Sequence, residues 1–324
     1  MTYSSGGLIQ ATDYNGFVST TAGANVNATW STGASNAGWG QTALGTVAAG
    51  GTVTATQWAS LVNTLASMGS QTGTAITARS APTAGQTISV LAAVNTDLTN
   101  CYNNRGNAAA SGTAYGTFSG TTSQVNPTGS GASAWTITFT HTVTFPSADQ
   151  ARYFFNAGGI VKIQYGKSSI GTDTDPDWNT LAGWCGSINI TGGAQTIASQ
   201  AYTGTTRLGG TGGTQTTLAT ATGWYALTAS PTTIFQLNNT IAPYTGEYIR
   251  TTATATSSTV LTLVTTWVDA GGGQTSNISG GSATASPSTT ITGTAPTTLV
   301  TYTPPSTLYL TNTWGTPTIS ASVA

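Results

Sequence analysis

The sequence predicts an α+β protein that is mainly β, in which a small N-terminal helical domain precedes one or more antiparallel, β-sandwich-like domains. Charged residues make up only 5% of the 324 residues, and Thr, Ser, Gly, Ala and Asn take their place. Because Thr is β-branched it favours strands, whereas Gly and Asn favour tight turns. Helix-capping patterns are concentrated before residue 108, and strict alternation of apolar residues with Thr follows it.

The clearest helix is expected to begin at Thr54. Thr54 and Gln57 form a capping box, in which the Thr side chain accepts from the backbone of Gln57 and the Gln side chain reaches back. Gly69 is expected to end this helix. The apolar residues between these limits have helical spacing: Trp58, Leu61, Val62, Leu65 and Met68.

Two further helices are expected in the same region. A second capping box, at Thr83 and Gln86, opens a helix that Gly106 ends, and a shorter helix begins at Thr12 and Asp13. Such short helices are not stable alone, so they pack on one another or on a neighbouring chain. The helix after Thr83 carries apolar residues at heptad-like spacing, namely Leu91, Val94, Leu98 and Cys101.

The strongest strand signal lies at residues 135–145. The five residues between its apolar positions are all Thr, which predicts one buried face and one hydroxylated face. After Pro146, Ser147 is expected to cap a short helix, a strand follows at 160–165, and another short helix opens at Asp175. The apolar face of the first strand is formed by Trp135, Ile137, Phe139, His141, Val143 and Phe145.

Beyond residue 186 the pattern is one of strands and turns. Residues 248–256 and 260–269 are expected to form a hairpin with Ser257 and Ser258 at its turn, and the Gly- and Ser-rich residues 270–290 indicate a loop. Further strands are expected at 188–190, 224–227 and 234–237. Prolines restrict the strands of the tail to sheet edges or make the tail an extended arm: Pro296, Pro304, Pro305 and Pro317.

These signals divide the chain into three segments. Residues 1–108 form the helical domain, and residues 109–270 form an antiparallel β domain with short helices, which begins with a linker or exposed loop at 109–134. Residues 271–324 form a Pro- and Thr-rich β tail, either separate or part of the second domain.

Few residues can carry acid–base or metal chemistry. The chain has seven basic residues, eight acidic residues and one histidine, with a formal net charge of −1. A Ser–His–Asp triad would have to use His141, but this residue lies on the apolar face of a strand, and no G-x-S-x-G elbow supplies a nucleophile. We therefore interpret His141 as a packed or interface histidine with hydrogen-bonded nitrogens. One histidine and two distant cysteines also cannot form a zinc site.

The only acidic cluster is Asp173, Asp175 and Asp177. Paired carboxylates cleave glycosidic bonds, so this cluster and Glu247 keep open the alternative of a glycan-cleaving protein. Acidic residues at a helix start also cap free N–H groups, which is the simpler interpretation. An EF-hand is excluded because Trp178 and Trp184 occupy the positions that require Gly and Glu; a looser calcium site at the three aspartates stays open.

Other ligands and locations are constrained by what the sequence lacks. There is no basic run for nucleic acid, no Walker lysine, no apolar stretch of membrane-spanning length and no signal-peptide pattern, so we expect synthesis in the cytosol and no membrane insertion or bound cofactor. Cys101 and Cys185 are expected to be reduced. Exposed aromatic residues among neutral polar ones suit sugars, and the candidates, each with burial in the core as the alternative, are Tyr225, Tyr244, Trp267 and Trp314.

The nearly neutral composition bears on solubility. A surface without charge is a liability for a free monomer. Either much of that surface is covered in an assembly, or Thr, Ser and Asn side chains keep it hydrated. Both situations are typical of particle components rather than of metabolic enzymes.

Several runs resemble a family of virion structural proteins of tailed phages, notably phages of cyanobacteria and other aquatic bacteria. The FFNAGG stretch within residues 148–163 is the most specific of them. The runs cover most of the chain: GLIQATDYNGFV at 7–18, GWGQTAL at 38–44, VTATQWASL at 53–61, ADQARYFFNAGGIVKI at 148–163, DPDWNTLAGWCGSI at 175–188, GWYALT at 223–228 and TVLTLVTTWVDA at 259–270.

The resemblance implies a non-enzymatic component of the virion, assembled in the host cytoplasm. We expect a tail fibre or other external appendage for host attachment that docks by its N-terminal region and projects the β-rich part. The alternatives are a capsid-surface or sheath-like filament protein and a glycan-cleaving tailspike. The expected partners are other virion proteins, a host surface glycan and further copies of the chain.

Because phage fibres are usually homotrimers, a homotrimer is the expected oligomer. Its seam on a threefold axis would be formed by Leu91, Val94, Leu98 and Cys101. The alternative is that these four residues pack within one chain.

Overall fold

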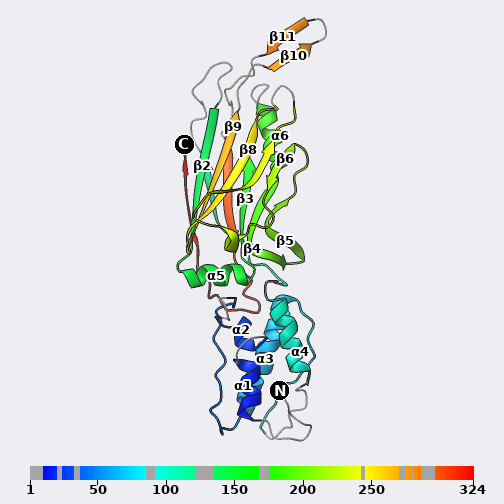
Figure 1. Cartoon of the computed structure of the whole chain (residues 1–324), viewed down its shortest axis with the longest axis vertical. Coiled ribbons are helices and arrows are strands. Elements are labelled where there is room, and N and C mark those ends of the chain that lie inside the picture. The colour runs from blue at the N-terminus through cyan, green and yellow to red at the C-terminus, as the bar shows by residue number, and fades with distance from the viewer. Residues whose placement is uncertain are drawn as a thin grey trace.

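The computed structural model is an elongated molecule with helices at one end and two β-sheets at the other (Figure 1). The predicted fold class, α+β and mainly β, is confirmed. The structure describes residues 10–19, 24–32, 37–84, 92–121, 135–167, 175–241, 245–269, 274–278, 281–285 and 296–324.

Within the described residues, four helices form the helical end. The central one, α3, has the predicted capping box: Thr54 Oγ1 accepts from the Gln57 N–H at 3.2 Å, and Gln57 Oε1 accepts from the Thr54 N–H at 2.9 Å. The ring of Trp58 on α3 meets that of Phe17 on α1 edge-on at 6.1 Å. The four helices are α1 (Ala11–Val18), α2 (Val26–Thr29), α3 (Ala55–Thr72) and α4 (Ala92–Asn103).

The predicted end of α3 at Gly69 is wrong. The helix continues to Thr72 and ends at Gly73, which has a left-handed conformation with a φ of 68°. Gly69 instead allows the returning chain to approach closely, because a Cβ there would lie 3.0 Å from Ile76 Cγ2. The start expected for the next helix cannot be compared, since Gln86 and Leu91 lie outside the described residues.

The β part consists of two larger antiparallel sheets and a separate two-stranded hairpin. The first sheet has the order β1 (Tyr115–Thr121), β12 (Thr297–Thr303), β3 (Ile160–Gly166), β4 (Ser187–Ile197), β5 (Gln200–Leu208). The second has the order β13 (Thr318–Val323), β2 (Trp135–Thr144), β9 (Val260–Asp269), β8 (Tyr248–Ser257), β7 (Thr232–Asn238), β6 (Thr214–Leu218). The hairpin pairs β10 (Gln274–Ile278) with β11 (Gly281–Ala285).

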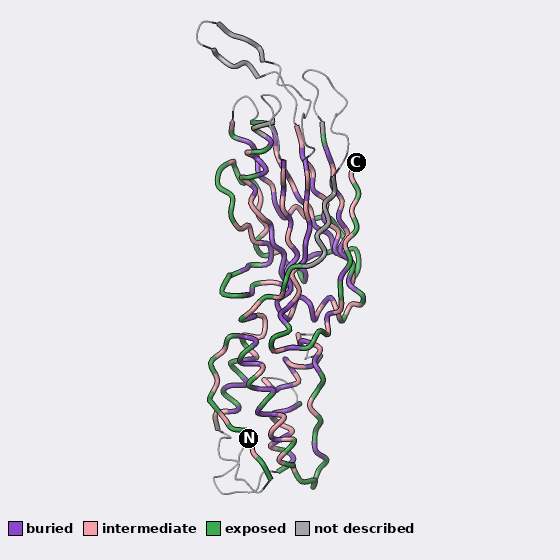
Figure 2. Tube along the Cα trace, turned by 180° about the vertical axis from the view of Figure 1, so that it is seen from behind, coloured by how far each residue is buried: buried purple, intermediate pink, exposed green. Residues whose placement is uncertain are grey.

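The two larger sheets pack face to face as a sandwich. The Tyr165 hydroxyl of β3 lies 2.8 Å from Thr251 Oγ1 of β8, and its ring stacks on Phe235 of β7 at 5.9 Å. Trp267 of β9 donates from Nε1 to Thr298 Oγ1 of β12 at 3.3 Å. Buried residues are accordingly frequent along the strands of the sandwich (Figure 2).

The helix α5 (Ala148–Asn156) lies across the end of the sandwich that faces the helical end (Figure 1). Ser147 caps it as predicted, accepting from the Gln150 N–H at 3.2 Å. Phe155 stacks at 5.2 Å on Trp224, which begins the short 3-10 helix η2 (Trp224–Ala226). Phe145 contacts both of these rings and Phe154, so α5 closes the sandwich with an aromatic cluster.

The helical end and the sandwich share one hydrophobic core. A single cluster of buried residues extends from α1 to the inner faces of both sheets. Polar side chains also cross between the two parts: Gln71 of α3 donates to the Ala157 carbonyl at 3.2 Å, and Asn156 donates to the Gly38 carbonyl at 2.9 Å. The two parts are therefore held to each other by apolar packing and by backbone-directed amides.

Several predicted strands and helices are confirmed. The strand at 135–145 is β2, whose inward positions from Ile137 to Val143 are buried, and the predicted hairpin is β8 and β9. The strand at 160–165 is β3, and the helix expected at Asp175 is α6 (Asp175–Cys185).

Other predictions are wrong. Part of the expected linker at 109–134 is a strand, β1, and the expected strand at 224–227 is a 3-10 helix. The prolines do not confine the whole tail to sheet edges, since β12 pairs on both sides, with β1 and β3. Pro296, Pro304 and Pro305 flank this strand and so do not interrupt its hydrogen bonds.

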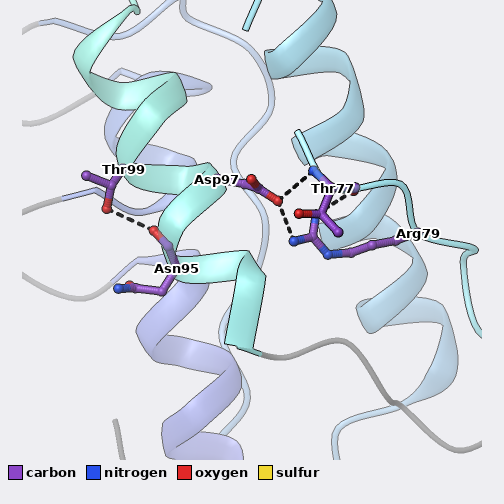
Figure 3. Close-up of polar contacts among 5 residues, drawn as sticks. All are labelled: Thr77, Arg79, Asn95, Asp97 and Thr99. Carbon is purple, nitrogen blue, oxygen red and sulfur yellow. Dashed lines mark hydrogen bonds and ion pairs between the residues drawn. The ribbon is translucent and has the colours of Figure 1, made fainter. Parts of the chain in front are cut away.

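A buried ion pair joins α4 to the segment after α3 (Figure 3). Asp97 Oδ2 contacts Arg79 Nη2 and accepts from the Thr77 N–H at 3.0 Å. The Arg79 side chain is 5% exposed and that of Asp97 is 6% exposed. Arg79 Nε is closed to solvent and has no hydrogen-bond partner among the described residues. Each of the two charges is therefore stabilised by its partner rather than by water.

We predict that Asp97→Asn lowers the free energy of unfolding by roughly 3–5 kcal/mol, because it leaves the Arg79 charge buried and unpaired. Urea denaturation followed by circular dichroism measures the change. As the control, the double variant Arg79→Met with Asp97→Leu removes both charges, and its free energy of unfolding should fall much less. A single variant as stable as the wild type would show that this pair is not a determinant of the helical end.

Candidate functional site

The carboxylates whose contacts are described bind backbone groups, arginines or an asparagine rather than converging on one site. Asp149 pairs with Arg152 at 2.5 Å. Glu247 is buried and accepts from Asn239 Nδ2 at 3.1 Å. Among the described residues no group of three His, Cys, Asp or Glu side chains could hold a metal ion.

The acidic cluster singled out from the sequence is only partly described. Asp173 lies outside the described residues, and of Asp175 and Asp177 the structure describes the backbone at the start of α6. The calcium site at these aspartates therefore stays a hypothesis. Glu247, the fourth acid considered for glycan cleavage, is 4% exposed.

His141 lies inside the sandwich on β2, opposite Leu263 of β9 and Ala321 of β13. Its side chain is fully buried, and neither ring nitrogen has a hydrogen-bond partner of ordinary geometry among the described residues. The interpretation as a packed histidine is confirmed, whereas the expected hydrogen bonds of its nitrogens are not observed. Burial lowers the pKa of His141 from 6.5 to about 4, a shift that the backbone of Thr298 partly opposes.

Because His141 is buried, we predict that the folded protein loses stability in acid. The lowered pKa means that the unfolded chain binds a proton near pH 6.5 while the folded chain does not. Stability is therefore complete above pH 6.5 and falls as the pH drops towards 4, with a loss of roughly 2 kcal/mol between pH 7 and pH 5. Urea denaturation at the two pH values measures it, and His141→Leu should remove that loss. A variant with the same pH dependence as the wild type would contradict the assignment.

Cys101 and Cys185 are free and buried, which agrees with the prediction that both are reduced. Burial raises the pKa of Cys101 to about 11 and raises the pKa of Cys185 still further. Both thiols are thus protonated at neutral pH, and neither is an activated nucleophile.

The residues proposed for a trimer seam lie in the core of the chain itself. Val94 is 1% exposed, Leu98 is 1% exposed and Cys101 is fully buried, among residues of the other helices. Leu91 lies outside the described residues. Packing within one chain, the alternative weighed for these positions, therefore accounts for the three that are described.

The aromatic candidates for sugar binding separate clearly. Trp267 and Trp314 are core residues, 0% and 1% exposed, so the prediction that they could bind a sugar is wrong. Tyr244 lies outside the described residues. Tyr225, on η2, is 53% exposed and is therefore the candidate that the structure retains.

Tyr225 lines a groove of about 540 Å³ between the helical end and the sandwich. Five segments distant in sequence form it. They are the chain at Ala37, the end of α4 with the residues after it, α5, the irregular middle of β4, and η2. Its principal polar and aromatic side chains are Asn103, Arg105, Arg152, Asn156, Gln195 and Tyr225.

Hydrogen bonds fix the walls of this groove. Asn156 Oδ1 accepts from the Tyr225 hydroxyl at 2.6 Å. Gln195 donates to the Phe155 carbonyl at 2.8 Å and accepts from the Gly192 N–H at 3.3 Å. Glycine at position 192 allows the ring to approach closely, because a Cβ there would lie 2.9 Å from Tyr225 Cε2. The groove therefore keeps its shape without a ligand.

The sequence indicates parts of the groove but does not bring them together. Asn156 belongs to the FFNAGG run, and the Gly192–Gly193 pair lies at a break in register within β4. No signal along the sequence indicates that these residues meet Arg105 and Arg152.

Comparisons of the chain with models of protein families, with curated proteins and with solved structures give no match. Within the described part of the chain, no helix combines the length and the apolar character needed to cross a membrane. What the groove and the surface can do is therefore argued from their own chemistry.

Proposed function

We propose that this chain is a structural subunit of a tailed-phage particle, a fibre or other external appendage that docks by its helical end and projects the sandwich. The observation that carries the proposal is the lack of charge on the sheet edges. The resemblance of the sequence to virion structural proteins supports a tailed-phage particle as the setting. The uncharged edges support the inference that the chain assembles with other subunits.

The sheet edges lack one of the usual protections against pairing with other chains, which is charge. Free proteins blunt exposed edge strands with charged residues, especially Lys. Of the four outer strands of the two larger sheets, β1, β6 and β13 contain no charged residue. The fourth, β5, contains Arg207, which donates to the carbonyls of Trp184 and Cys185. Such edges suit a chain whose neighbours cover them.

The shape fits the same role. The helices and the far ends of the strands lie at opposite ends of a long body, and the C-terminal strand β13 runs along the sandwich (Figure 1). The shared core makes this body one unit, so a load on the projecting end would reach the docking end. A capsid-surface or sheath-like filament protein would use the same edges laterally, and copy number separates the two roles.

A glycan-cleaving tailspike receives less support. No carboxylate is among the described residues that line the groove, and the buried Glu247 is hydrogen-bonded to Asn239. Glycoside hydrolysis needs two carboxyl groups facing the sugar. We therefore propose a role without catalysis.

Charged edges should weaken assembly. We predict that the wild type forms an oligomer, with a trimer as the expected state, and that Thr216→Lys on β6 together with Ser320→Lys on β13 raises its dissociation constant at least about tenfold. Sedimentation equilibrium measures the oligomeric state and the dissociation constant. The matched control is Ser230→Lys with Ser258→Lys, which adds the same charge at exposed positions outside the strands.

Two results would count against the proposal. A wild-type chain that stays monomeric at its highest soluble concentration would contradict assembly itself. An oligomer that the edge variant and the control variant leave equally intact would contradict the role of the edges.

A further inference from the structure

We propose that the groove beside Tyr225 binds an acidic saccharide, with the Tyr225 ring as the platform for a sugar ring and Arg105 as the group that binds its carboxylate. This goes beyond the role in a particle and does not depend on it. The argument rests on the exposure of the ring, the balance of charge and the rigidity of the walls.

The Tyr225 ring is unusual in this molecule for being exposed and fixed at once. It is 53% exposed, and the other large hydrophobic side chain exposed in the described residues is Leu308. Its hydroxyl donates to Asn156 Oδ1, which holds the ring in place, and the ring lies against Gly192. An aromatic face covers the C–H groups of a sugar ring, and a ring that is already fixed loses little conformational entropy on binding.

The charge of the groove favours an anion. Among the described residues, two guanidinium groups line it, those of Arg105 and Arg152, and no carboxylate does. Asp149 offsets the charge of Arg152 from outside the lining, so one positive charge is left over. A carboxylated sugar brings one negative charge to the groove.

Arg105 has donors available for that carboxylate. Its guanidinium lies 4.1 Å from the centre of the Tyr102 ring and donates from Nη1 to the Tyr102 carbonyl at 2.6 Å. These contacts orient the planar group and occupy one of its five N–H donors. Two parallel N–H groups of a guanidinium match the two oxygens of a carboxylate, which a lysine cannot reproduce.

Neutral groups complete a surface suited to hydroxyls. Asn103 is exposed at the rim of the groove, and the irregular stretch of β4 brings the backbone of residues 192–194 to its wall. A Cβ added at Gly193 would meet nothing within 4 Å, so the groove is open there. Its volume of about 540 Å³ falls within the range of small-ligand pockets.

Isothermal titration calorimetry on the full chain tests the proposal. The probes are oligogalacturonate, oligomannuronate, oligoglucuronate and sialyllactose, with neutral maltotriose for comparison. We expect at least one carboxylated probe to bind at least about tenfold more tightly than maltotriose, because the guanidinium–carboxylate pair is absent from the neutral sugar. Added salt should weaken that binding, since the groove lies at the surface.

Groove variants separate this site from other binding. Tyr225→Ala and Arg105→Ala should each weaken binding of the acidic probe about tenfold or more, whereas Tyr225→Phe, which keeps the ring, should retain most of it. The controls are Leu308→Ala, an exposed apolar side chain, and Lys162→Ala, a cation; neither residue lines the groove. Circular dichroism verifies the fold of each variant.

Three outcomes would overturn the proposal. These are no binding of any carboxylated probe, equal binding of maltotriose, and equal binding by the groove variants and the controls. None of them bears on whether the chain assembles, so failure here is distinguishable from failure of the proposed role in a particle.

Discussion

The scarcity of charge is the constraint on which the rest of this structure depends. With seven basic and eight acidic residues in 324, the fold is held by apolar packing and by hydrogen bonds of Thr, Asn and Gln. One continuous core therefore has to reach from the helices through the sandwich. Three of the few ionic groups hold neighbouring segments together. Arg79 and Asp97 connect α4 to the chain after α3, and Arg207 donates to carbonyls at the end of α6.

The same constraint shapes the chemistry that the described residues offer. Burial makes His141 a weak base and keeps both thiols protonated, so none of these three side chains is an activated base or nucleophile. The described surface includes uncharged sheet edges and a groove with arginines, amides and an exposed tyrosine. Uncharged edges favour contact with other subunits, and such a groove favours contact with a small anionic ligand. Both proposed roles require binding alone.

The sequence predicts the elements whose signals are local. The capping box at Thr54, the alternation in β2 and the hairpin of β8 and β9 can be read within a dozen residues. It does not predict β1, because that strand is completed by β12, which lies almost at the other end of the chain. The Thr-rich strands β5 and β6 lack alternating apolar residues, so the sequence contains no two-residue periodicity that would predict them. The groove was missed for a related reason, since its five segments meet only through the packing of α5 on the sandwich.

Cryo-electron microscopy of the assembly that the chain forms tests the central claim, that neighbouring subunits cover the edges of a chain so poor in charge. The account predicts several symmetry-related copies in which neighbouring subunits cover the edge of β6 or of β13. A map in which the chain is present but both edges face solvent in every copy would contradict it.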